Sequence, residues 1–109
     1  MHYNMSMHNS DINIDLFARL FSALGDANRQ HILELLRENE ELTVTDIASH
    51  FNLAQPTISQ HLKVLREIGV VQARRAGQHV YYRICNVKVY DAMKAFMAVY
   101  AAEKDNKLK

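Results

Sequence analysis

With 109 residues, the chain has room for one domain with a modest core and none for a second. Hydrophobic residues make up 49% of it, yet no apolar run is long enough for a membrane helix or a signal peptide, so we expect a folded cytoplasmic protein without a membrane partner. The net charge of +1 is unevenly spread, because residues 1–53 carry −5, residues 54–83 carry +4 and residues 84–109 carry +2. A polyanion would therefore meet the middle of the chain and be repelled by the N-terminal half.

Two amphipathic helices are predicted in the N-terminal third of the chain. Ser10 or Asp11 can cap the first, and Gly25 is suited to end it. Asp26 then caps the second helix, which we expect over residues 27–38. Both segments carry apolar residues at helical spacing, so each is expected to bury one face in a shared core.

The stretch that organises the chain is residues 43–71, which predict two short helices joined by a tight turn. Thr43 is placed to cap the first helix, and Pro56 stands in the first turn of the second, where its missing N–H costs nothing. Within the second helix, residues 55–67, apolar side chains step by four and three residues and predict a buried stripe: Ile58, Leu62 and Leu65. This is the pattern of a helix-turn-helix.

The outward side of that second helix carries amides, hydroxyls and cations: Gln55, Thr57, Ser59, Gln60, Lys63 and Arg66. Amides and hydroxyls can read base edges in the major groove, and cations can hold phosphates. We therefore interpret residues 55–67 as a recognition helix for double-stranded DNA.

Two strands are predicted next, over residues 70–75 and 79–84, because β-branched and aromatic residues dominate both and Gly77 suits a tight turn between them. Polar and basic side chains gather around the tip of this hairpin: Arg74, Arg75, Gln78 and His79. A basic hairpin directly after a recognition helix is a wing, which we place at residues 72–83. We expect it to lie along the phosphate backbone or in the minor groove.

The last helix is predicted over residues 87–103, with Asn86 as its cap and almost no polar face. A helix that is apolar nearly all round must be covered on more than one side, and in so small a chain another copy is the expected second cover. We predict a homodimer through this helix and the first one, with six candidates at the interface: Phe17, Leu20, Met93, Phe96, Met97 and Tyr100. The rival interpretation, a membrane-surface helix, would need a strongly charged face, which this helix lacks.

The predicted order of elements, α-α-α-α-β-β-α, and three segments resemble the ArsR/SmtB family of winged-helix repressors. The matching segments are residues 20–29 with 32–36, residues 55–67 with Gly69, and hairpin residues 75–78 with Tyr81 and Tyr82. The resemblance implies a mainly α fold with a β-hairpin wing, a homodimer, and binding to imperfect palindromes in promoters until an effector releases it. It also places four residues where relatives touch DNA: Gln55, Pro56, Ser59 and Gln60.

The sensing sites that the resemblance would imply are absent from this sequence. Many relatives have Glu-Leu-Cys-Val-Cys-Asp-Leu where this chain has Glu-Leu-Thr-Val-Thr-Asp-Ile, so Thr43 and Thr45 replace two thiolates and are poor ligands for soft metals. A second family site needs histidines in the last helix, and none follows His79. Cys85 is the one cysteine, which rules out a cysteine pair within the chain. We therefore predict no metal and no cofactor.

Three possibilities for regulation stay open on the sequence. Four histidines could form a non-standard metal site across the dimer: His2, His8, His31 and His50. A small organic effector could instead enter the apolar seam between the terminal helices, or the protein could lack an inducer. His61, inside the recognition helix, is interpreted as a packing residue or a phosphate contact.

No paired carboxylates, glycine-rich phosphate loop or nucleophile–base grouping indicates an enzyme. We interpret the chain as a dimeric, sequence-specific repressor of transcription, whose operator has inverted half-sites about one helical turn apart. The alternatives are a winged-helix protein-interaction module and a metal sensor with a non-standard histidine site. One domain is expected over residues 11–103, between a flexible polar tail at 1–10 and a charged tail at 104–109.

Overall fold

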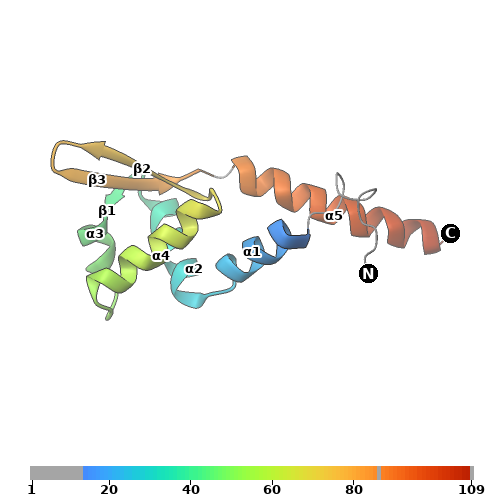
Figure 1. The fold of residues 1–109 in the computed structure, drawn as a ribbon, viewed down its shortest axis with the longest axis horizontal. Helices are drawn as coiled ribbons and strands as arrows, with labels where there is room; N and C mark the ends of the chain where they lie inside the picture. Colours follow the sequence, from blue (N-terminus) through green and yellow to red (C-terminus); the bar gives the residue numbers. More distant parts are fainter. Residues whose placement is uncertain (1–13, 86, 109) are drawn as a thin grey trace.

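The computed structural model describes residues 14–85 and 87–108, which form a mainly helical fold with a small antiparallel sheet (Figure 1). In chain order the elements are α1 (Ile14–Leu24), α2 (Ala27–Glu38), β1 (Leu42–Thr43), α3 (Val44–Ala48), α4 (Gln55–Glu67), β2 (Val71–Ala76), β3 (His79–Ile84) and α5 (Val87–Leu108). The predicted fold class is confirmed. Several predictions lie outside the described residues: the caps Ser10, Asp11 and Asn86, the tail at 1–10, and His2 and His8.

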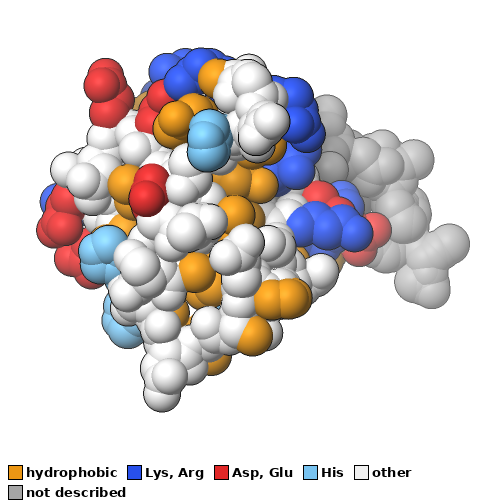
Figure 2. Space-filling view, turned by 90° about the vertical axis from the view of Figure 1, so that its left-hand side faces the viewer, with side chains coloured by type: hydrophobic (Ala, Val, Ile, Leu, Met, Phe, Trp, Pro, Cys, Tyr) orange, Lys and Arg blue, Asp and Glu red, His pale blue; other side chains and the backbone are white. Residues whose placement is uncertain are grey.

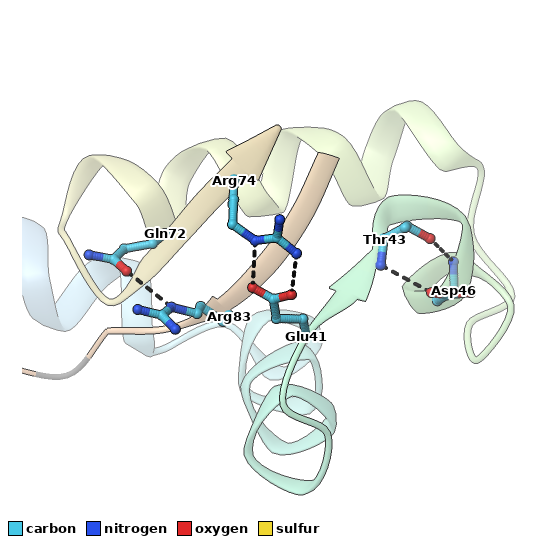
Figure 3. Close-up of polar contacts among 6 residues, drawn as sticks. All are labelled: Glu41, Thr43, Asp46, Gln72, Arg74 and Arg83. Atoms are coloured by element: carbon cyan, nitrogen blue, oxygen red, sulfur yellow. Dashed lines mark hydrogen bonds and ion pairs between the residues drawn. The ribbon is translucent and has the colours of Figure 1, made fainter. Parts of the chain in front are cut away.

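Side chains at the helix starts explain where α2 and α3 begin. The Asp26 carboxylate accepts a hydrogen bond from the backbone N–H of Arg29 at 3.0 Å, and this bond lowers the pKa of Asp26. At α3, the Thr43 hydroxyl accepts from the N–H of Asp46, while the Asp46 carboxylate accepts from the N–H of Thr43, both at 3.1 Å (Figure 3). This reciprocal capping box fixes the first turn of a five-residue helix.

The core lies where α2, α3 and α4 meet the base of the hairpin. Its largest fully buried side chains are Ile32, Ile47, Ile58, Leu62 and Leu65, and Leu20 of α1 is buried to the same degree outside this cluster. The predicted stripe on α4 is therefore confirmed, and burial of each such side chain stabilises the fold by about 1.5–3 kcal/mol. The buried stripe therefore anchors α4 to the core and leaves its opposite side exposed.

The sheet has the strand order β1-β3-β2. β2 and β3 pair from Val71↔Ile84 to Ala76↔His79, which leaves Gly77 and Gln78 as a two-residue loop. Gly77 has φ +64°, a conformation that glycine adopts without a Cβ clash and that tight hairpins need. The predicted hairpin is confirmed, whereas β1 was not predicted, because two residues are too few to show strand alternation.

α5 extends away from the body and gives the molecule its longest dimension, 54 Å (Figure 1). α1 packs against it through aromatic rings, since Phe96 meets Phe17 at 5.2 Å and Phe21 at 4.8 Å between centroids, both edge-on. The helix continues to Leu108, beyond the end predicted at residue 103.

Candidate nucleic-acid interface

α4 turns its apolar stripe inward and exposes the residues predicted to meet DNA. All the candidates on this helix are exposed: Gln55, Pro56, Thr57, Ser59, Gln60 and Lys63. We call these six residues the α4 outer face. Their neighbours Ile58 and Leu62 are fully buried, so the same helical period that fixes the core also presents this face.

The start of α4 has no capping side chain, because Ala54 stands at the N-cap and Pro56 in the first turn. The Ala54 carbonyl accepts hydrogen bonds from the N–H groups of Thr57 at 3.0 Å and Ile58 at 3.2 Å. Such a helix start carries partial positive charge and attracts phosphate groups. The N-terminal turn of α4 is therefore electrostatically suited to a nucleic-acid backbone without carrying a formal charge.

Arg74, predicted as a wing residue, is engaged within the chain. Its Nε and Nη2 donate to the two carboxylate oxygens of Glu41 at 3.0 and 2.6 Å (Figure 3), and its guanidinium lies 5.0 Å from the centre of the Tyr81 ring. These hydrogen bonds lower the pKa of Glu41 and raise that of Arg74. The fork geometry ties the loop before β1 to the hairpin and places a carboxylate directly against the charge of Arg74.

Arg75 lies on the other face of the hairpin. The strand register pairs Arg74 with Tyr81 and Arg75 with Val80, and consecutive strand residues point to opposite faces. Within the described part of the chain, the exposed side chain of Arg75 makes no ion pair and no side-chain hydrogen bond. Exposed Gln78 and His79 complete the tip, so the wing offers an unpaired cation beside two polar groups.

Figure 2 views the side of the molecule on which the hairpin tip, α3 and the start of α4 lie. Lys and Arg side chains gather around the top of this face, and its lower part is largely uncharged (Figure 2). Acidic side chains lie mainly toward its left edge. A DNA duplex placed here would have cations near its phosphates and neutral polar groups near its bases.

Thr43, where the family resemblance implies a thiolate, has a structural use here, because its hydroxyl is engaged in the capping box. His31 and His50 border a shallow hollow of about 410 Å³, and Cys85 is a half-buried thiol at the end of β3. Among the residues that the structure describes, no three His, Cys, Asp or Glu side chains converge in a way that could hold a metal ion.

Sequence reasoning missed two contacts that position this surface. The sequence gives no sign that Glu41 pairs with Arg74, which lies 33 residues further along the chain. Arg29 was not singled out, yet its Nη1 lies 3.1 Å from Nδ1 of half-buried His61 and links α2 to α4. Strand register and helix packing create both contacts, and neither leaves a local sequence signal.

A short helix, an exposed second helix and a basic hairpin define a winged helix-turn-helix DNA-binding protein. A family model described as "Bacterial regulatory protein, arsR family" matches residues 26–73. The chain is 36% identical over 89 residues to the transcriptional repressor SdpR of Bacillus subtilis (strain 168), which covers 82% of this chain and 97% of that protein. It is 39% identical over 74 residues to the cadmium resistance transcriptional regulatory protein CadC of Listeria innocua, and the match covers 68% of this chain and 62% of that protein. The structure of an ArsR-like transcriptional regulator from Rhodococcus sp. RHA1 matches with a TM-score of 0.75 at 24% identity, over 86% of this chain and 87% of that one, and shows the shared fold.

The chain belongs to the ArsR family of bacterial regulatory proteins. It is a DNA-binding transcriptional repressor of that family, which confirms the prediction that it is not an enzyme. None of the helices in the described ranges combines the length and apolar character that crossing a membrane requires.

Proposed function

We propose that the chain acts as a homodimer that represses transcription from an inverted-repeat operator. In this proposal α4 enters the major groove, and the wing, residues 72–83, follows the phosphate backbone or the minor groove. The observation that carries it is the division of one exposed surface into neutral amides and hydroxyls on α4 and basic groups on the hairpin. Hydrogen-bonding groups specify bases, while cations position the protein on phosphates.

The proposal gives the exposed residues different tasks. Gln55, Ser59 and Gln60 read base edges, because amides and hydroxyls can both donate and accept. The remaining candidates hold or line the backbone: Pro56, Thr57, Lys63, Arg75, Gln78 and His79. Arg74 takes a supporting role, because its pair with Glu41 fixes the wing against the loop before β1.

A second copy is proposed to cover the apolar side of α5. Tyr90, Met97 and Tyr100 are 61%, 58% and 49% exposed in the single chain, which is unusual for three large side chains on one helix. Phe17 and Leu20, predicted at the interface, are 7% and 2% exposed, because they already pack within the chain. Phe17 and Leu20 therefore lie beneath the proposed interface and do not form its surface. That surface is formed mainly by α5, where half-buried Met93 and Phe96 lie beside the exposed residues.

Regulation is proposed to work without a metal at the start of α3. The relative CadC is named for cadmium resistance. In this chain the start of α3 carries Thr43 and Thr45, whose hydroxyls are poorer ligands for a soft metal than thiolates are. The Thr43 hydroxyl is in addition committed to the cap of α3.

Fluorescence anisotropy with a labelled duplex from the chain's own upstream region tests this function. We expect tight binding of one dimer to that duplex, and binding to a scrambled duplex that is weaker by about 10³-fold or more at physiological salt. Sedimentation of the free protein at the same concentrations reports the dimer. Equal affinity for both duplexes would contradict the proposal and favour a protein-interaction module, and a binding species that stays monomeric would contradict the dimer.

A further inference from the structure

A cavity of about 650 Å³ lies between α1 and the C-terminal end of α4, away from the α4 outer face. Its volume falls in the range of small-molecule sites in proteins. Much of its wall is apolar, with Leu16, Ala18, Ala23, Val64, Ile68 and Gly69 contributing. Nothing in the proposed DNA contact uses this space.

The charged groups of the cavity are mostly cationic. Arg19, Arg29 and Arg66 line it, against the one carboxylate of Glu67. Within the described ranges, none of the three arginines lies within ion-pair distance of a carboxylate. Three guanidinium groups beside an apolar wall form an environment that favours a ligand with a negative charge and an apolar body.

Arg29 is the best fixed of the three. Its Nε donates to the Ala23 carbonyl at 2.7 Å, its Nη2 to the Ser22 carbonyl at 3.4 Å, and its Nη1 lies 3.1 Å from Nδ1 of His61. A guanidinium has five N–H groups, so these contacts leave two N–H donors for a further acceptor. A planar donor held in this way is preorganised for the two oxygens of a carboxylate.

We infer that this cavity binds a small organic acid, with its carboxylate at the arginines and its apolar part against α1 and the end of α4. A second hollow, of about 390 Å³, lies between α1 and α5. Among the described residues that line it, the charged one is Asp91, whose carboxylate would repel an anion. The chemistry of the lining therefore selects the first cavity for an acidic ligand.

The site is coupled to the recognition helix through Arg29, and this part of the inference rests on the proposed function. His61 follows Gln60 in α4, so the residue that lines the cavity also contacts the helix that reads DNA. A carboxylate bound to the two remaining N–H groups shares this guanidinium with His61, so it weakens the contact between Arg29 and His61 and with it the link between α2 and α4. Occupancy of the cavity is then expected to lower operator affinity, and operator binding to lower the affinity of the acid equally.

The binding step is tested on the full chain without DNA, by NMR titration with 1-naphthylacetate and with its neutral isostere 1-naphthylacetamide. We expect the acid to shift resonances of Ala18, Ala23, Ile68 and the His61 ring, and to bind about tenfold more tightly than the amide. Arg19→Gln combined with Arg66→Gln should weaken the acid about tenfold, and Ala18→Phe should block it by filling the cavity. Arg37→Gln, which removes one exposed charge outside the cavity, is the matched control and should leave binding unchanged.

Equal binding of acid and amide, shifts elsewhere on the molecule, or no binding at millimolar concentration would overturn the site. The regulatory step is measured by repeating the operator titration with saturating 1-naphthylacetate. A loss of operator affinity that disappears in Ala18→Phe supports the coupling, and an unchanged affinity with the site occupied overturns it. Failure of the acid-free protein to distinguish operator from scrambled duplex would contradict the proposed function instead and leave the NMR result standing.

Discussion

Helices α4 and α5 differ in how completely their apolar side chains are buried within the chain. α4 buries Ile58, Leu62 and Leu65 completely and exposes a polar outer face, so its own chain meets all its packing needs. α5 packs against α1 through Phe96, yet it keeps Tyr90, Met97 and Tyr100 exposed. The comparison shows that an amphipathic helix can bury all its apolar side chains within one chain, whereas a helix with apolar residues on several sides needs a further surface to cover them.

The largest expected effect compares a buried residue of α4 with an exposed one of α5. Leu62→Ala should lower the free energy of unfolding by about 2–5 kcal/mol, because it opens a cavity in the core. Met97→Ala should change the stability of the single chain by at most about 0.5 kcal/mol, and its larger effect should depend on protein concentration, because it acts on the proposed dimer. Urea unfolding at several protein concentrations measures both. Similar, concentration-independent losses would show that Met97 is not at an interface between copies.

The next effect is on assembly. Met97→Glu with Tyr100→Glu should convert the proposed dimer to a monomer, because each apolar side chain that is no longer buried costs about 1.5–3 kcal/mol and buried carboxylates add a desolvation cost. Sedimentation velocity measures the change, and far-ultraviolet circular dichroism shows that the helices persist. Glu34→Gln on α2, also an exposed position, is a control that should leave the dimer intact. A stable dimer of the double variant would place the interface elsewhere.

Hydrophobic periodicity and turn residues predicted most of the fold, because both signals come from residues that are close together in the sequence. Residues 27–38 and 55–67 form helices with the predicted bounds, and Thr43 caps α3 as expected. Gly77 forms the turn of the hairpin. β1 could not be predicted, because its two residues form a strand only by pairing with β3. No pattern in the neighbouring sequence indicates that pairing.

The candidate site was predictable in outline and not in its pairings. The helical period exposed Gln55 and Gln60 together, and the charge count placed cations on the hairpin. The different roles of Arg74 and Arg75 could not be read from the sequence, since both are arginines in one strand. Only the register decides which of them faces Glu41.

A smaller effect tests whether the outer face of α4 reads bases. Gln55→Ala should reduce discrimination between operator and scrambled duplex by about 1–3 kcal/mol, because a base edge loses its amide partner. Anisotropy titrations against both duplexes measure it. Gln78→Ala removes an amide from the hairpin loop and is expected to weaken both duplexes alike. If Gln55→Ala also weakens both equally, Gln55 contacts the backbone and the polar side of α4 does not specify sequence at this position.

The smallest effect separates the two neighbouring arginines of the hairpin that flanks α4. Arg75→Ala should weaken binding to all duplexes and flatten the slope of log affinity against log salt by about one unit per protomer, because one phosphate contact is lost. Arg74→Ala should change that slope less, since Arg74 is already paired with the Glu41 carboxylate. Glu41→Gln removes the charge that holds Arg74 and should steepen the slope, because the released guanidinium becomes available to phosphate. Equal slopes for Arg74→Ala and Arg75→Ala would show that DNA draws Arg74 away from Glu41, so that the pairing in the free protein does not limit which cations the wing offers to DNA.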